Sequence, residues 1–163
     1  MKRLLSILFA AALLVTMTGV AQATIGWAGQ IWPVNGTTVS DNAGVGVYFQ
    51  IWKGGVTDQA GQGAGISATL YYGPNGGPYT SVAMTYNTDV GNNDEYTGTI
   101  PSSALQGLSE IWFYCDAYDE TDMTTYTGAQ DQWGNNPPFQ LVITQTLGQD
   151  VTVTFFMCMP PEG

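Results

Sequence analysis

The amino-acid sequence predicts an all-β protein built as an antiparallel β-sandwich, and three observations favour this fold class. The chain is rich in threonine, valine, tyrosine and glycine, which are typical of strands and of the turns between them. Short runs of alternating apolar and polar residues recur between turn signals, at a spacing of roughly 8–12 residues. No window carries the 3.6-residue periodicity of an amphipathic helix, so a helical or α/β fold is not expected.

A secretory signal peptide is predicted at the N-terminus. Lys2 and Arg3 precede an apolar run over residues 4–20, and the Ala-Gln-Ala sequence that follows has the small-residue pattern cut by signal peptidase. We expect a signal peptide over residues 1–23 and one exported domain over residues 24–163, long enough to bury its own core. An uncleaved anchor is the alternative, because the apolar run is nearly long enough to span a bilayer.

Export would leave a strongly acidic protein. Lys53 is then the only basic residue against thirteen acidic ones, and the chain has no histidine. This charge argues against nucleic acids and anionic membrane surfaces as partners, and no membrane insertion is expected after signal cleavage. The lack of histidine removes the commonest general base and the commonest zinc ligand. We expect a secreted, extracellular protein, either free or associated with the cell surface.

The first half of the domain contains five predicted strands, each followed by a turn signal. Pro33 ends the first strand, and Gly54-Gly55 ends the second. In the second strand, valine, phenylalanine and isoleucine alternate with tyrosine, glutamine and tryptophan, so that one face is apolar. A dense turn over residues 73–78 follows the third strand, and an acidic connection over residues 86–96 separates the last two. The predicted strands are 25–32, 45–53, 66–72, 79–86 and 96–100.

The second half begins with a single helical turn predicted within residues 102–110. Residues 111–118 then alternate between an apolar face and a polar or aromatic one, which predicts a central strand. A polar loop over residues 119–138 leads to two last strands, 139–145 and 151–159, joined by a hairpin turn. Seven or eight antiparallel strands, with no helix to cross between them, favour an immunoglobulin-like β-sandwich.

Three short pieces of the sequence are similar, in order and spacing, to a known type of module. The pieces are Gly26-Trp27 to Trp32-Pro33, Gly54-Gly55-Val56-Thr57 leading into Gly65-Ile66-Ser67-Ala68, and Tyr86-Asn87-Thr88-Asp89 through Asn92-Asn93-Asp94-Glu95-Tyr96. Over residues 25–119 the chain resembles the immunoglobulin-like β-sandwich modules of large secreted bacterial proteins, including starch-degrading and other carbohydrate-active enzymes. The resemblance implies a non-catalytic accessory role outside the cell, with carbohydrate or a cell-surface component as the ligand.

The C-terminal residues depart from this resemblance. Residues 150–160 are similar to the opening strand of a starch-binding-like module, yet the chain stops at Gly163. Either the chain is a truncated fragment of a larger protein, or its last strand functions without the rest of such a module. That strand is long, β-prone and uncharged after Asp150, so an exposed edge of it would pair with another copy. A structural subunit that self-associates through this strand is the alternative function, against an ordinary strand that completes its own sandwich.

An acidic cluster between the fourth and fifth predicted strands is a candidate calcium site. Asp89, Asn92, Asp94 and Glu95 lie within seven residues, and Ca²⁺ prefers six to eight oxygen ligands from such groups. The spacing is not that of an EF-hand loop. The alternative is a β-turn in which these side chains bond their own backbone and Gly91 takes a positive φ. No other cofactor is expected.

Catalysis is not expected from this sequence. A glycosidase needs two carboxyl groups about 5–9 Å apart across a cleft. The adjacent Asp94 and Glu95 point to opposite faces of an extended chain, so they do not form such a pair. The sequence also lacks a nucleophile elbow and a glycine-rich phosphate loop.

Five tryptophans are many for a chain of 163 residues. Trp52 and Trp112 fall on the faces of their strands opposite the aliphatic residues, and Trp133 lies in a polar loop. Exposed aromatic rings suit sugar rings. These three side chains are therefore the predicted contacts for a polysaccharide or surface component. The alternative is that loops or the second sheet cover them.

Cys115 and Cys158 are the only cysteines, and export would take them to an oxidising compartment. Cys115 lies on the apolar face of its predicted strand, whereas the alternation turns Cys158 away from the aliphatic side. A Cys115–Cys158 disulfide is one possibility, and pairing of Cys158 with another chain is the other.

Overall fold

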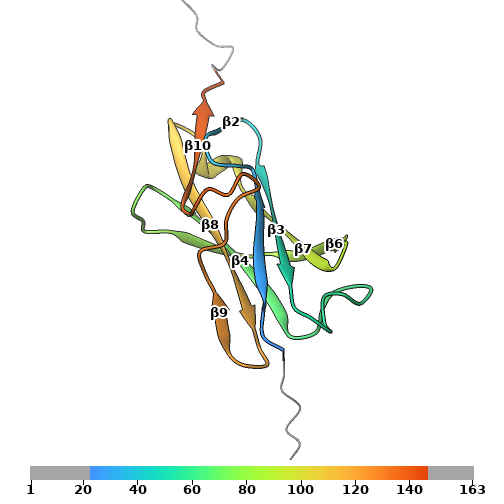
Figure 1. Ribbon diagram of the computed structural model, residues 1–163. Coiled ribbons are helices and arrows are strands. Elements are labelled where there is room, and N and C mark those ends of the chain that lie inside the picture. The colour runs from blue at the N-terminus through green and yellow to red at the C-terminus, as the bar shows by residue number, and fades with distance from the viewer. Residues whose placement is uncertain (1–22, 147–163) are drawn as a thin grey trace, which may run out of the picture.

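The computed structural model describes residues 23–146, and Figure 1 shows them as a β-rich domain between two grey ends. Cys158, the last predicted strand at 151–159 and all but the last residue of the predicted signal peptide lie outside the described residues. A single turn of 3-10 helix at Ser102–Ala104 confirms the expected helical turn. The strands are β1 Trp27–Trp32, β2 Thr37–Ser40, β3 Val45–Trp52, β4 Ile66–Gly73, β5 Thr80–Ala83, β6 Thr85–Val90, β7 Asn93–Ile100, β8 Glu110–Asp119, β9 Thr124–Tyr126 and β10 Phe139–Thr144.

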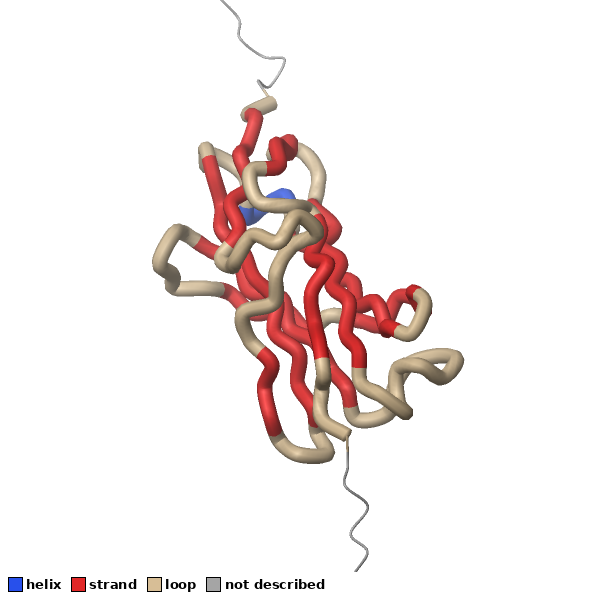
Figure 2. The backbone as a smooth tube through the Cα atoms, in the orientation of Figure 1, coloured by secondary structure: helices blue, strands red, loops and turns tan. Residues whose placement is uncertain are grey.

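Two sheets pack as a sandwich, which confirms the predicted fold class (Figure 2). One sheet has the order β1-β3-β7-β6, and the other has the order β2-β10-β8-β4-β5, with β9 paired to β8. These orders correspond to the A-B-E-D and G-F-C-C′ sheets of immunoglobulin domains. Ten strands are described where seven were predicted within these residues, because β2 and β9 are too short to show alternation and the predicted strand 79–86 is divided between β5 and β6. Pairing is antiparallel except between β10 and β2.

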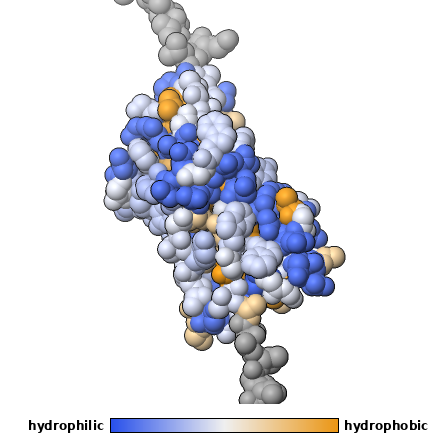
Figure 3. All heavy atoms as spheres, in the orientation of Figure 1, coloured by the Kyte–Doolittle hydropathy of each residue, from blue (hydrophilic) through white to orange (hydrophobic). Residues whose placement is uncertain are grey.

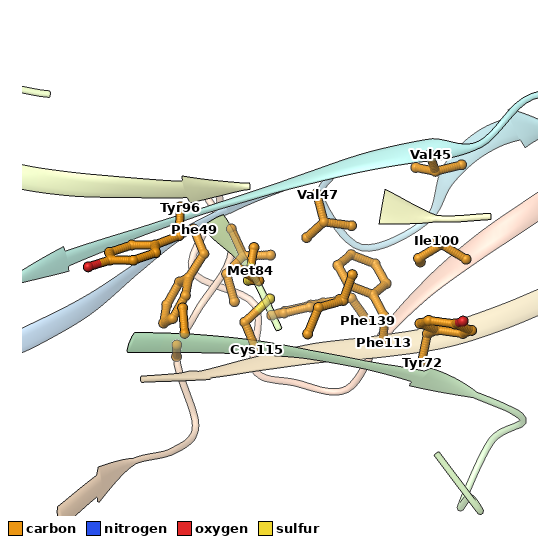
Figure 4. Packing of buried hydrophobic residues seen from close by; sticks show 14 of the residues in the cluster. Val45, Val47, Phe49, Tyr72, Met84, Tyr96, Ile100, Phe113, Cys115 and Phe139 are labelled. Carbon is orange, nitrogen blue, oxygen red and sulfur yellow. The ribbon is translucent and has the colours of Figure 1, made fainter. Parts of the chain in front are cut away.

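Alternation along β3 and β8 places every second side chain inside the sandwich. Val47, Phe49 and Ile51 of β3 are fully buried, and Phe113 and Cys115 of β8 are buried in the same cluster. Figure 4 shows most of these side chains meeting between the sheets. Burying an aliphatic or phenylalanine side chain stabilises a fold by roughly 1.5–3 kcal/mol. Cys115 therefore belongs to the core, where burial raises the pKa of its thiol.

The predicted strand over residues 79–86 is divided between the two sheets. β5 pairs with β4, and after Met84 the chain crosses over and continues as β6 beside β7. Met84 is buried, and its backbone N–H donates to the Ala68 carbonyl oxygen at 2.9 Å. The alternation continues through this point because Val82 and Met84 both pack against the core. The pattern alone therefore does not reveal that the chain changes sheet.

The acidic connection predicted over residues 86–96 is mostly strand. β6 and β7 extend into it and pair as far as Val90 and Asn93, which leaves only Gly91 and Asn92 as the turn. Gly91 has φ 66°, as a tight two-residue hairpin requires, so the expected turn is confirmed there. The carboxyl groups on either side lie on a ladder, where neighbouring residues point to opposite faces.

A buried ion pair connects the end of β3 with the end of β8. Lys53 Nζ lies 2.8 Å from both carboxylate oxygens of Asp119, and the two side chains are 1% and 0% exposed. Thr121 Oγ1 accepts from Lys53 at 2.8 Å and donates to Asp119 at 2.6 Å. Burial raises the pKa of Asp119, but the hydrogen bonds from Lys53 and Thr121 outweigh burial and hold it below its usual range. Lys53 is the only basic residue in the described part of the chain.

Candidate functional site

Four aromatic side chains share the outer face of β1 and β3, and we call them the aromatic strip. The register pairs Trp27 with Trp52 and Trp32 with Tyr48. Facing residues of an antiparallel pair point to the same side of a sheet. Because the neighbouring Ile51 is buried, the strip faces away from the core. Trp32 and Trp52 are 43% and 38% exposed, and the Trp32 and Tyr48 ring centroids are 6.0 Å apart.

Two indole rings of the strip lie against backbone that carries no side chain. A Cβ atom at Gly26 would come within 2.4 Å of Trp52 Cζ3, and one at Gly29 within 2.7 Å of Trp27 Cζ2. Glycine alone leaves room for these rings, so each ring lies over a glycine. Figure 3 shows pale residues of intermediate hydropathy over β1 and β3, bordered by strongly hydrophilic ones.

A hydrogen-bonded polar network of Gln50, Asn87, Asn93 and Glu95 lies beside the strip. Glu95 Oε1 accepts from Asn87 Nδ2 at 2.7 Å, and Gln50 Oε1 accepts from Asn93 Nδ2 at 3.1 Å. Gln50 Nε2 lies 3.4 Å from Glu95 Oε2. Gln50 also sits within the strip on the outer face of β3. The surface therefore suits a ligand that has apolar faces and a hydroxylated rim.

A β-bulge in β1 brings Trp27 and Trp32 to the same face. In a regular strand, residues five positions apart point to opposite faces. The register shifts between Gly29 and Trp32, and Gln30 has φ 53°, a conformation that costs a non-glycine residue about 1–2 kcal/mol. The extra residue turns Trp32 outward. Strict alternation separates these two tryptophans, which is why the sequence pattern pointed to Trp52 and not to its neighbours.

Of the three tryptophans predicted as ligand contacts, only Trp52 lies in the strip. Trp112 is on the outer face of β8, in the other sheet, where its Nε1 donates to Glu110 Oε1 at 3.2 Å. Trp133 is 75% exposed, on the loop between β9 and β10. Because the two sheets pack face to face, Trp52 and Trp112 lie on opposite outer faces of the sandwich. The three predicted contacts therefore do not form one surface.

Asp131 holds the loop that carries Trp133 beside β1. Its carboxylate accepts hydrogen bonds from the backbone N–H groups of Asn35, Trp133 and Asn135, each at 2.9 Å. Burial raises the pKa of Asp131, but hydrogen bonds from Asn135, Asn35 and Trp133 outweigh it and hold the pKa below its usual range. A groove of about 390 Å³ lies between this loop and β1, and Trp27 of the strip is part of its lining.

The four predicted calcium ligands do not meet at one point. Asp89 and Asp94 accept hydrogen bonds, at 2.9 and 2.7 Å, from two backbone N–H groups of the glycine-rich loop over residues 56–65. Glu95 belongs to the polar network on the outer face, and Asn92 lies in the hairpin turn. Within residues 23–146, no group of three or more acidic or cysteine side chains is arranged to hold a metal ion. The two aspartates instead fasten the glycine-rich loop to the hairpin.

Asp94 makes stability depend on pH. Its side chain is fully buried and Oδ1 has no hydrogen-bond partner. Burial chiefly, with a smaller contribution from the charge of Asp89, raises its pKa. A raised folded-state pKa contributes stability that is fully present below the unfolded value of about 3.9 and is lost as pH rises through the folded value. Asp94→Asn should therefore gain in unfolding free energy over the wild type between about pH 4 and pH 7, measured by urea unfolding.

The matched control is Asp89→Asn on the facing strand. Hydrogen bonds from Tyr86 and Gly61 lower the pKa of Asp89. The contribution of Asp89 to the unfolding free energy therefore has the opposite pH dependence and is lost as pH falls. If the unfolding free energies of Asp94→Asn and the wild type change in parallel with pH, the pH dependence does not come from Asp94.

No protein-family model matches the chain. Among curated proteins, the chain is similar to an amylopullulanase from Thermoanaerobacterium thermosulfurigenes, with 28% identity over 130 residues. The match covers 63% of this chain and 7% of the amylopullulanase, so the chain spans a small part of that protein's length. In this coarse form the expected resemblance is confirmed: part of the chain is distantly related to a carbohydrate-active enzyme. In the described part of the chain, no helix combines the length and apolar character needed to cross a membrane.

Proposed function

We propose that the chain is a secreted, non-catalytic module that binds polysaccharide through the aromatic strip. The observation that carries this proposal is the strip itself: four aromatic rings share one outer face, and two of them lie on glycines. The rings offer apolar area to the CH faces of sugars, and the polar network offers amide and carboxylate groups to their hydroxyls. The similarity to an amylopullulanase supports an α-glucan as the ligand class.

The length of the strip favours a chain of sugars over a single ring. The Trp27–Trp52 pair and the Trp32–Tyr48 pair are four residues apart along β3, which corresponds to roughly 13 Å at the rise of an antiparallel strand. One sugar ring does not span this distance, whereas a few linked rings do. An exposed strip of this length therefore suits a polysaccharide.

The non-catalytic part of the proposal rests on where the carboxyl groups point. Asp94 is turned into the core, whereas its neighbour Glu95 is held on the outer face by Asn87. Glycosidases place two carboxyl groups across one cleft, and these two lie on opposite faces of the same strand.

Gly26→Ala tests the strip without removing any aromatic residue. The new methyl group would displace the Trp52 ring, and we expect a several-fold weaker affinity for amylose or pullulan, measured by affinity electrophoresis. Gly46→Ala is the matched control, because its Cβ would lie 3.5 Å from Tyr48, an ordinary contact on the same face. Equal affinities for Gly26→Ala and Gly46→Ala would contradict the role of the Trp52 ring, and a wild-type chain that binds no polysaccharide would refute the proposal.

A further inference from the structure

The groove between β1 and the loop after β9 adjoins the aromatic strip on the side away from β3. Figure 1 shows the segment between β9 and β10 running beside β1. Trp27 belongs both to the strip and to the groove lining. The opposite wall comes from the end of β9 and the loop after it, and it includes Tyr126, Gln130 and Gln132. A ligand that lies along the strip therefore meets this groove at its Trp27 end.

The walls of the groove are fixed to each other by backbone hydrogen bonds. The Ile31 N–H donates to the Gln130 carbonyl oxygen at 3.2 Å, and the Gln132 N–H donates to the Ile31 carbonyl oxygen at 3.3 Å. Asp131 lies between the two glutamines, is 4% exposed and is fully occupied with loop hydrogen bonds. The groove is therefore a formed feature of the fold, and it does not need to be induced by a ligand.

The lining of the groove is mostly polar. Three glutamines belong to it, Gln30, Gln130 and Gln132, together with the aromatic residues Trp27 and Tyr126. Amide groups donate to and accept from hydroxyls, and an aromatic ring packs on the CH face of a sugar. A volume of about 390 Å³ lies at the small end of ligand pockets. This combination fits one sugar residue rather than an extended chain.

One residue of the groove lining, Gln30, has a strained backbone. Gln30 has φ 53°, which is unfavourable for a residue with a Cβ atom, and its side chain is exposed beside the groove. The bulge requires this backbone conformation, and glycine would adopt it without strain. Residues with such backbone strain cluster at active sites and ligand-binding sites.

We propose that the groove binds the terminal residue of the glucan chain whose body lies on the aromatic strip. This inference rests on the proposed polysaccharide binding and adds that the module recognises chain ends. The amides of Gln30 and Gln132 contact the hydroxyl groups that only a terminal residue leaves free. The main chain stays on the open strip, since the groove is bounded by the loop and has room for one residue.

The experiment compares three forms of one probe by calorimetry: maltoheptaose, maltoheptaose with its non-reducing terminal ring capped as a 4,6-acetal, and maltoheptaose reduced to the alditol at its other end. We expect one of the two end modifications to weaken binding about tenfold and the other to leave it unchanged, which also identifies the end that enters the groove. Equal affinity for all three forms would overturn the groove assignment while leaving the proposed function intact. No binding of any form would overturn both.

The variant Gln30→Gly/Gln132→Ala should lose the tenfold preference, while its melting temperature stays equal to or above that of the wild type because the strain at Gln30 is relieved. Gln106→Ala, an exposed glutamine outside the groove lining, is the matched control and should retain the preference. A double variant that still discriminates between the end-modified sugars would refute the role of these amides.

Discussion

Lys53→Met is expected to lower the free energy of unfolding by about 3–5 kcal/mol, because it leaves the buried Asp119 carboxylate without its partner. Lys53 and Asp119 are 1% and 0% exposed, so water does not replace the lost contact. Thr121 donates to Asp119 through both its backbone N–H and its hydroxyl, but neither group carries the missing charge. Urea unfolding of the variant at neutral pH measures the loss.

A second variant completes this test by replacing both residues of the ion pair. Lys53→Met/Asp119→Leu removes the two charges together, and buried pairs replaced by apolar residues of similar size are often neutral or stabilising. We expect the double variant to recover most of the loss seen in Lys53→Met. If the unfolding free energy of Lys53→Met lies within about 1 kcal/mol of the wild-type value, the pair contributes no more than an exposed salt bridge does.

Trp32→Ala/Trp52→Ala is expected to weaken polysaccharide binding about a hundredfold. The two residues belong to different pairs of the strip, roughly 13 Å apart, so their effects should add. We expect each substitution to reduce the binding free energy by about 1.4 kcal/mol, which corresponds to a tenfold loss of affinity. Both side chains lie on the outer face of their sheet, so the melting temperature should change little. Affinity electrophoresis in gels containing amylose measures the change.

Trp112→Ala provides the control. This residue lies on the outer face of β8, in the other sheet, and therefore away from the strip. The control should bind within a few-fold of the wild type. If it loses as much affinity as the strip variant, the ligand contacts the other sheet, as the sequence prediction of Trp112 has it.

The sandwich was predictable because alternation is a local property. Along β3 and β8, each second residue is apolar, and this pattern gives both the strand and its inward face. The sheet to which a strand belongs is set by pairing between distant segments. The chain crosses between the sheets at Met84, but apolar side chains face inward on both sides of this point. The sequence pattern therefore does not reveal the crossing.

The site was less predictable because it depends on departures from regular structure. Trp27 and Trp32 share a face only through the bulge at Gln30, and the Trp27 and Trp52 rings need the glycines beneath them. The sequence does not show how the acidic residues are separated, for the opposite reason. The hairpin is more regular than expected, so alternation along β7 sends Asp94 inward and Glu95 outward.

The most direct test of the account is to follow the five indole N–H signals by NMR while maltoheptaose is added to the ¹⁵N-labelled chain. Single tryptophan-to-phenylalanine variants assign each signal. We expect the signals of Trp27, Trp32 and Trp52 to shift with one common binding constant, while that of Trp112 stays in place. Shifts confined to Trp112 or Trp133, or no shift in any strip tryptophan at saturating sugar, would contradict the claim that the strip is the binding surface.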